Sequence, residues 1–498
     1  MSLEEKNRSK DSKSPNPESE DSSSDTSLYR RFESCFSGIT VEPVIFCYAF
    51  GIILHVPVIQ QYIHQRLSEG KGLTYEYNNT DSRTTCEPIQ MANSSEETLE
   101  LQKEVQAEAS YMQMGLVLSV STPSLLVALL LGAWSDRAGR RRAMAMPIFG
   151  SAVESAIILV IMYFELPVTF LLLAEIINGS CGFFPTMVLS VFSYIADITE
   201  ESQRAFRLGI LEAIAFISGM LSHLTSGWWI NNLGFRAPYW LLLILNTFAL
   251  LYVTFILPES RAKHVMEKSK VRVLSLDHIR AIVMIFTKSR DPQRMTIFMV
   301  ISGLMIVSSI GFGSVFVLYA LDRPLCCNAI LIGYYLGLSF FVQAVGAVLG
   351  LKYLRLCLSE TALMQVGMVS IISSLVVMAF VTSKKTLFVV PFVACLGGVP
   401  TPTIRAMMSK MVDADGQGAL FAAVASLETL CTLLGALVFN SIYPYSIRIG
   451  LKGLSFMVMA WLMLIAFILI EFIRRREKNK ETERKELVNE EDRHSDKE

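Results

Sequence analysis

Long apolar runs are the feature that most constrains this chain. About twelve runs of roughly 20 residues occur along its length, and each can cross the ~30 Å hydrocarbon core of a bilayer. Only 18% of the 498 residues are Asp, Glu, Lys or Arg, whereas about a quarter is usual in soluble chains. The sequence therefore predicts an all-α membrane protein with many spans and argues against a soluble enzyme.

The expected spans also give an orientation. An even number of spans places both termini on one side of the membrane, and short loops rich in Lys and Arg stay in the cytosol. Basic residues precede the first span, follow the second and follow the last, which predicts that both termini are cytosolic: Arg30, Arg31, Arg137, Arg140, Arg141, Arg142, Arg474, Arg475 and Arg476. The expected spans are 43–63, 111–134, 144–164, 168–193, 206–229, 236–257, 295–320, 329–352, 360–381, 386–408, 417–441 and 450–472.

Twelve spans interrupted by one central polar stretch indicate two six-helix halves. Many secondary transporters are built from two such halves around a central site. The expected regions are a cytosolic tail without a packed core at 1–40, a first half at 41–257, a basic cytosolic loop at 258–294, a second half at 295–472 and a cytosolic tail at 473–498.

The polar segment at 64–110 is expected to face outward. It holds two glycosylation triplets, at Asn78 and Asn93. Cys86 lies in the same loop, and outward-facing thiols tend to pair. Its candidate partners are Cys326 and Cys327, between the seventh and eighth expected spans.

The turn after the second span combines glycines, an acid and basic residues. Gly132, Asp136, Gly139 and Arg140 form G-x3-D-x2-G-R, which resembles a motif of the major facilitator superfamily. The glycines permit a tight turn, and Asp136 can accept from a helix N-terminus or an arginine. We expect this turn to act as a conformational gate on the cytosolic face.

Three ionisable residues inside expected spans are candidates for the chemistry, because a charge at the bilayer centre costs about 2.5–3.5 kcal/mol. Glu212 is a candidate proton carrier or a structural carboxylate. Arg405 follows a Gly- and Pro-rich break and could bind an anionic substrate bidentately, or pair with an acid. Glu428 could bind protons or substrate, or pair with Arg405.

Short strings spread over residues 41–472 resemble solute carrier family 46 of the major facilitator superfamily. They occur in the family's order: Val41-Glu42-Pro43, the gate turn, Leu211-Glu212-Ala213, Pro324-Leu325-Cys326, Ile332-Gly333-Tyr334, Ile404-Arg405-Ala406, Ser409-Lys410, residues 417–421 and residues 439–444. The resemblance implies a major facilitator fold that imports organic anions with protons. It further implies proton coupling at Glu212, substrate binding and coupling at Arg405, and a conformational role for Asp136 and Arg140.

The resemblance also implies a disulfide between Cys86 and Cys326. Two positions depart from the folate-transporting members of the family, where a histidine stands in place of Ser309 and an aspartate in place of Phe183. The sequence around Glu428 resembles the lysosomal branch of the family instead. A proton-linked carrier of organic anions is therefore better supported than a folate carrier.

The resulting prediction is a proton-coupled symporter of organic anions, either folate-like molecules or related conjugates, working by alternating access. The alternatives are a proton-independent facilitator or exchanger and a non-transporting sensor or scaffold. We expect the plasma membrane as its location, with a lysosomal or endosomal membrane as the alternative. No cofactor or metal is expected, and its partners are the substrate, protons and lipid. The net charge of −1 argues against nucleic acid, and the sequence leaves the oligomeric state open.

Overall fold

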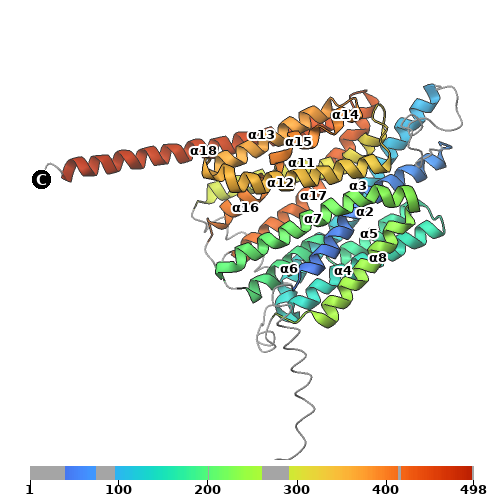
Figure 1. Ribbon diagram of the computed structural model, residues 1–498, viewed down its shortest axis with the longest axis horizontal. Coiled ribbons are helices and arrows are strands. Elements are labelled where there is room, and N and C mark those ends of the chain that lie inside the picture. The colour runs from blue at the N-terminus through green and yellow to red at the C-terminus, as the bar shows by residue number, and fades with distance from the viewer. Residues whose placement is uncertain (1–39, 74–95, 200, 261–290, 413–416, 496–498) are drawn as a thin grey trace, which may run out of the picture.

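The computed structural model describes residues 40–73, 96–199, 201–260, 291–412 and 417–495. In this part of the chain every regular element is a helix (Figure 1). Helices from the first part of the chain are α2 (Glu42–Gly70), α3 (Glu96–Ala138), α4 (Arg140–Tyr163), η1 (Val168–Phe170), α5 (Leu171–Ser180), α6 (Phe183–Ile198), α7 (Glu201–Leu233), α8 (Arg236–Leu251) and η2 (Tyr252–Ile256).

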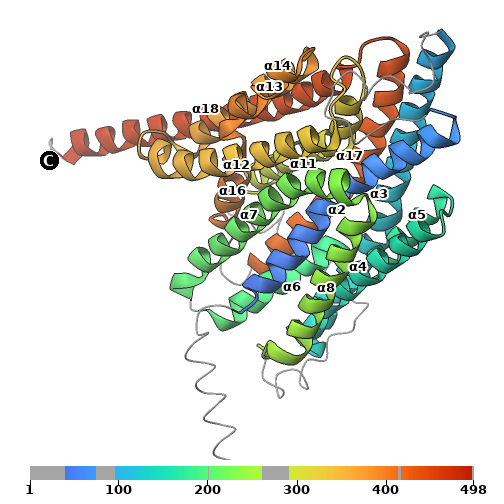
Figure 2. The same cartoon turned by 45° about the vertical axis from the view of Figure 1, so that its right-hand side comes forward.

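The second part of the chain supplies the remaining elements. They are α11 (Pro292–Leu321), α12 (Ala329–Tyr353), η3 (Leu354–Leu356), α13 (Glu360–Ala379), α14 (Lys384–Leu387), α15 (Val390–Val393), η4 (Cys395–Gly398), α16 (Pro400–Ser409), α17 (Gln417–Arg448) and α18 (Leu454–Ser495). From both viewpoints the helices α2–α8 form one group and α11–α18 another, side by side (Figures 1 and 2).

Many of these helices are long and apolar enough to cross a membrane. Among the described residues nine helices meet that condition, and a tenth span results if the pair Lys384–Val393 and Cys395–Ser409, bent by 46°, is taken as one. Helices α3 and α7 follow the two further predicted spans at 111–134 and 206–229. The chain is a multi-pass membrane protein, and the count of twelve spans stays a prediction.

Three helices extend well beyond the predicted spans. Helix α2 continues to Gly70, α3 begins at Glu96, and α18 runs on to Ser495 as one straight helix that leaves the bundle (Figure 1). The added segments are rich in Glu, Arg and Lys, which favour helix without being apolar. Hydropathy detects only the part of a helix that lies in lipid, so the predicted boundaries fell short.

The predicted span 168–193 corresponds to one candidate span, Val168–Ile195, whose helix is interrupted between α5 and α6. Between α5 and α6 the backbone of Gly182 adopts φ +97°, a conformation that glycine reaches without steric cost. On the α5 side of this break Gly179 packs so closely on α3 that a Cβ there would lie 2.2 Å from the carbonyl oxygen of Val120. A close crossing between helices explains why this position is glycine.

The two groups of helices meet along α7 and α12. Gly227 of α7 lies against the backbone of Ala329, where a Cβ would come within 2.3 Å of the carbonyl oxygen. Gly333 of α12 in turn lies against the backbone of His223. Small residues on both helices permit this backbone approach, as is common between helices in membranes.

Candidate functional site

The break between α15 and α16 positions the arginine that the sequence singled out. Helices α14 and α15 end before the short turn η4, and α16 then carries Arg405. A Cβ at Gly346 of α12 would lie 1.7 Å from the carbonyl oxygen of Cys395, and one at Gly367 of α13 would lie 2.6 Å from Pro400. Glycines on two neighbouring helices thus hold the broken segment at close range and fix where α16 starts.

Arg405 forms an ion pair with Glu428 of α17. The Nη2 atom of Arg405 donates to Oε1 of Glu428 at 2.5 Å. The two side chains remain 32% and 30% exposed, respectively. The structure therefore brings together two of the three predicted residues. They form the ion pair that the sequence analysis gave as one alternative for each of them.

The third residue, Glu212, lies on α7, about a third of the way from the start of that helix. The side chains of Glu212 and of Asp136 on α3 lie outside the described part of the structure, and the surroundings of Gly132 are not described either. Proton coupling at Glu212 and gating by Asp136 stay predictions.

The remaining predicted gate residues, Gly139 and Arg140, lie in a polar network where α4 begins. Both carboxylate oxygens of Glu259 accept from backbone amides at this helix N-terminus, from Arg140 at 2.8 Å and from Arg141 at 3.4 Å. A Cβ on Gly139 would lie 2.3 Å from Glu259, and Gly139 adopts φ +97°. The positive end of the helix dipole adds to the attraction for this carboxylate.

The guanidinium of Arg140 contacts another element. Its Nε donates to Oδ2 of Asp197 at 3.1 Å, which ties the start of α4 to the end of α6. Neither Glu259 nor Asp197 was predicted from the sequence. Each is an acidic residue just after an expected span, on the same side of the membrane as the basic turn. That position could have indicated that they contact the turn.

The two halves are hydrogen-bonded near the end of the bundle where α2 finishes, which we call the Gly70 end. Gln60 of α2 donates from Nε2 to the carbonyl of Gly313 at 3.1 Å. Ser110 of α3 donates to the backbone carbonyl of Asn440 at 3.1 Å and lies 3.2 Å from its side-chain oxygen. Among the described residues the hydrogen bonds between the two halves lie toward this end, so the halves are closed there.

A third inter-half contact lies beside these two. The hydroxyl of Tyr443 on α17 donates to Oε1 of Gln106 at 3.4 Å, and the amide of Gln106 lies 3.3 Å from Nε2 of His64. All three residues are buried, with exposed fractions below a tenth. The closed end therefore includes a buried polar contact between the halves.

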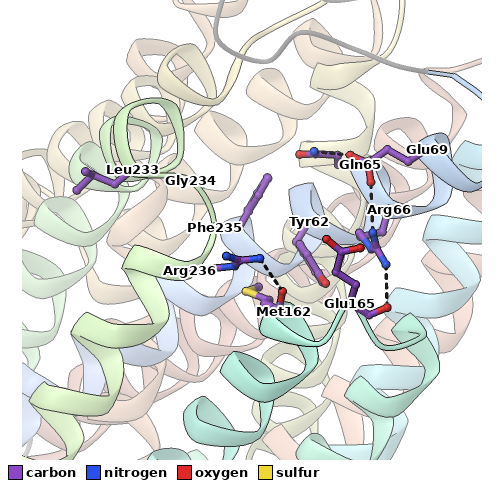
Figure 3. Close-up of a pocket in the computed structure, with 10 residues that line it drawn as sticks. All are labelled: Tyr62, Gln65, Arg66, Glu69, Met162, Glu165, Leu233, Gly234, Phe235 and Arg236. Atoms are coloured by element: carbon purple, nitrogen blue, oxygen red, sulfur yellow. Dashed lines mark hydrogen bonds and ion pairs between the residues drawn. The ribbon is translucent and has the colours of Figure 1, made fainter.

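A cavity of about 340 Å³ opens at the Gly70 end of the first half (Figure 3). Arg66 donates to the backbone oxygen of Glu165 at 3.1 Å and Arg236 to that of Met162 at 3.1 Å. All of its lining residues come from the first half, with none from α11–α18. A carrier site must contact both halves in turn, so this cavity is separate from the Arg405–Glu428 pair.

The predicted modification sites lie largely outside the described residues. Asn78, Asn93 and Cys86 fall in the undescribed segment 74–95. Cys326 is disulfide-bonded, whereas the neighbouring Cys327 is a free, buried thiol. The pairing of Cys326 with Cys86 and the glycosylation of both asparagines therefore stay predictions.

A cluster of ionisable residues inside the first half went unrecognised in the sequence. His55 of α2, Glu154 of α4 and Glu175 of α5 each place one side-chain atom within 4.8 Å of the other two. The sequence analysis had not singled out any of them as a site. The three residues lie in three separate spans, so their spacing in the sequence does not indicate that they are close. Only the packing of the helices shows that they meet.

Comparison with known proteins identifies the class. Residues 42–436 match the Major Facilitator Superfamily. The human organic anion transporter MFSD10 (TETRAN) has the same fold, with a TM-score of 0.60 at 16% identity over 86% of this chain and 98% of that one. A D-xylose–proton symporter also has a TM-score of 0.60, at 12% identity over 87% and 97% of the two chains. The chain is thus a membrane carrier with the major facilitator fold, not an enzyme.

Two relatives narrow the assignment. The proton-coupled folate transporter of Rattus norvegicus is 32% identical over 433 residues, covering 86% of this chain and 91% of that protein. The lysosomal proton-coupled steroid conjugate and bile acid symporter SLC46A3 of Gallus gallus is 31% identical over 440 residues, covering 86% and 92%. This chain belongs to solute carrier family 46 of the Major Facilitator Superfamily.

Proposed function

We propose that this carrier is a proton-coupled symporter of organic anions that works by alternating access. The observation that carries the proposal is the Arg405–Glu428 pair beside the broken helix. A guanidinium offers planar, paired donors that suit carboxylates, sulfates and phosphates. The names of both curated relatives include proton coupling, which supports the same assignment.

The pair suggests how a proton and an anion are coupled. While Glu428 is ionised it occupies the guanidinium of Arg405. A proton on Glu428 removes its negative charge and so strengthens the attraction of Arg405 for a substrate anion. Without a proton, binding an anion would place two negative groups around one arginine. Proton and anion would therefore bind together, with Glu212 as the second proposed coupling residue.

The orientation proposed from the sequence agrees with the placement of the charges. The opposite end of the bundle, where α2 begins at Glu42, holds Arg140, Arg207 and Arg294. We propose that this end faces the cytosol, following the positive-inside tendency. Closure at the Gly70 end then corresponds to a state closed to the outside. The plasma membrane and the lysosomal membrane are both candidate locations for the protein. Microscopy of tagged protein together with organelle markers distinguishes between them.

The test of this function is an uptake screen in proteoliposomes. Folates, antifolates, sulfated steroids and muramyl peptides are offered at an external pH of about 5.5 and of about 7.4. We expect stronger uptake of at least one anion at the lower pH, and loss of that stimulation in Glu428→Gln. Lys410→Gln is the matched control, because Lys410 pairs with Glu360 on the surface, five residues after Arg405. Equal uptake at both pH values for every accepted anion would contradict proton coupling.

A proton-independent facilitator or exchanger is the second candidate. It is favoured by Ser309 on α11, which is exposed and stands where folate-transporting members of the family have a histidine. A protonophore separates the two candidates at fixed external pH, since only a symporter loses concentrative uptake.

We also propose the disulfide between Cys86 and Cys326 and glycosylation at Asn78 and Asn93. Proteolysis without reductant should yield one cross-linked peptide that contains both cysteines. A peptide that instead joins Cys326 to another cysteine would refute that pairing. Removal of N-linked glycans should lower the apparent mass, and replacing both asparagines by glutamine should abolish that shift.

A further inference from the structure

The first half contains a buried group of titratable side chains far along the helices from either end of the bundle. Glu154 and Glu175 are only 7% and 5% exposed. The side chain of His55 is 15% exposed and lies between them. Neither the substrate pair nor the gate network uses these residues.

The side chains lie close together and several of them are hydrogen-bonded. Nε2 of His55 lies 3.1 Å from Oε1 of Glu175, and Nδ1 lies 4.0 Å from Oε1 of Glu154. The hydroxyl of Tyr239 on α8 lies 3.2 Å from the same Nδ1. Asn178 donates from Nδ2 to Oε2 of Glu154 at 2.7 Å, which fixes that carboxyl from the side of α5.

Further polar groups lie beside the cluster. Helix α2 adds Tyr48, whose hydroxyl is buried beside Glu154 and Ser151. Cys181, at the end of α5, is a further neighbour of that hydroxyl. Among the described residues the polar partners of Glu154 are His55, Glu175 and Asn178, with no Lys or Arg.

The charge balance decides what the cluster can hold. With both carboxyls ionised and the imidazole neutral, two negative charges would lie within a few ångströms of each other in a poorly solvated interior. Such a state is strongly disfavoured, because like charges and desolvation act together. Binding one proton reduces the net charge of the cluster from −2 to −1, and binding a second makes it neutral. Protons are therefore the simplest ligand that compensates the two carboxylates.

We infer that His55, Glu154 and Glu175 form a proton-binding site in the first half, separate from the Arg405–Glu428 pair. The geometry fits protons better than a metal ion. Both ring nitrogens of His55 already lie at hydrogen-bonding distance from another side chain, and Nδ1 and Glu154 are 4.0 Å apart. Ligands of one zinc ion at about 2.0–2.2 Å would have to be closer to one another than that.

The proposal concerns proton binding alone, so its test uses no substrate and its failure leaves the proposed function untouched. Purified full-length protein in lipid nanodiscs is studied by infrared difference spectroscopy between about pH 5.5 and 7.4. The C=O stretch of a protonated carboxyl group reports each buried acid that gains a proton. We expect Glu154→Gln and Glu175→Gln each to lose a component of this signal, because an amide keeps the shape but does not titrate.

Two further variants make the assignment specific. Glu165→Gln is the control, because Glu165 is an exposed acid at the Gly70 end and should leave the buried-carboxyl signal unchanged. Tyr239→Phe removes the hydroxyl beside His55 and should shift the pH midpoint of the signal without abolishing it. Nitrogen-15 NMR of the chain's six histidines, assigned through His55→Gln, gives a second measurement. The His55 resonance should titrate in the wild type and shift its midpoint in Glu175→Gln.

Two outcomes would overturn the inference. One is an unchanged carboxyl signal in folded Glu154→Gln and Glu175→Gln protein together with a His55 resonance that does not titrate. The other is a large rise in thermal stability on adding zinc chloride that the wild type shows and both variants lack. That result would assign the cluster to a divalent cation.

Discussion

At the scale of single residues, the proposed function depends on a charge pair placed beside a break in a helix. Arg405 and Glu428 lie 2.5 Å apart and are partly exposed, whereas His55, Glu154 and Glu175 are largely enclosed. Both members of the pair lie in helices that can span a membrane, where a charge is costly, and we therefore propose a binding role for them.

Replacing Arg405 by lysine tests the need for a guanidinium. Lysine keeps the positive charge but loses the planar pair of donors, so it cannot hold an anion bidentately. We expect at least a tenfold loss of uptake at low substrate concentration, equivalent to about 1.4 kcal/mol. Initial rates in proteoliposomes check this, and Lys410→Arg serves as the conservative control. Unchanged uptake in Arg405→Lys would mean that this residue contributes charge alone.

Gly346 tests the close packing that holds the broken helix. A Cβ there would lie 1.7 Å from the carbonyl oxygen of Cys395, which is backbone and cannot move aside cheaply. Gly346→Ala should lower the free energy of unfolding by about 1–3 kcal/mol, the usual cost of overpacking. Thermal unfolding in detergent measures it. Gly313→Ala is the matched control, because nothing lies within 4 Å of the added methyl.

At the scale of elements, the structure is a set of rigid helices whose contacts differ between the two ends of the bundle. The Gly70 end has direct hydrogen bonds between α2 or α3 and α11 or α17. At the opposite end, Arg140, Asp197 and Glu259 join helices within the first half. Alternating access requires the first set of contacts to break while each half stays intact.

Ser110 tests whether those contacts set the conformational equilibrium. Ser110→Ala removes a hydrogen bond to Asn440, which contributes about 1 kcal/mol and therefore favours opening of the Gly70 end about fivefold. Electron–electron distances between spin labels at exposed Glu165 and Lys385 report the opening. Ser180→Ala is the control, since Ser180 bonds only within its own helix, to Ile176. An unchanged distance distribution in Ser110→Ala would show that other contacts hold this end closed.

The loop between α11 and α12 gives a prediction with a pH dependence. Burial raises the pKa of the Cys327 thiol to about 11. Since the thiolate is the reactive form, only roughly one in four thousand molecules carries it at pH 7.4. An alkylating reagent should modify exposed Cys357 and spare Cys327 at that pH, and labelling of Cys327 should rise as the pH approaches 11. Mass spectrometry of the peptides checks this, and equal labelling at pH 7.4 would contradict the burial.

At the scale of the whole molecule, the sequence predicted the fold class because apolar length and charge placement are direct consequences of the bilayer. It also singled out Arg405 and Glu428, since charges inside spans are costly and therefore conspicuous. It could not show that the two residues pair or that His55 meets Glu154 and Glu175, because those contacts depend on how separate helices pack. It missed Glu259 and Asp197 for the same reason, and the helical extensions of α2, α3 and α18 because they lie outside the apolar runs.

The most direct test of proton-coupled symport is the accumulation ratio of an accepted anion in proteoliposomes with an acidic exterior. With the membrane potential clamped at zero, one proton per singly charged anion permits accumulation of up to about tenfold per pH unit. We predict that the wild type accumulates the anion and loses the gradient with a protonophore, whereas Glu212→Gln loses accumulation but keeps exchange. An accumulation ratio of one in the wild type, or full acid-driven accumulation in Glu212→Gln, would contradict the account.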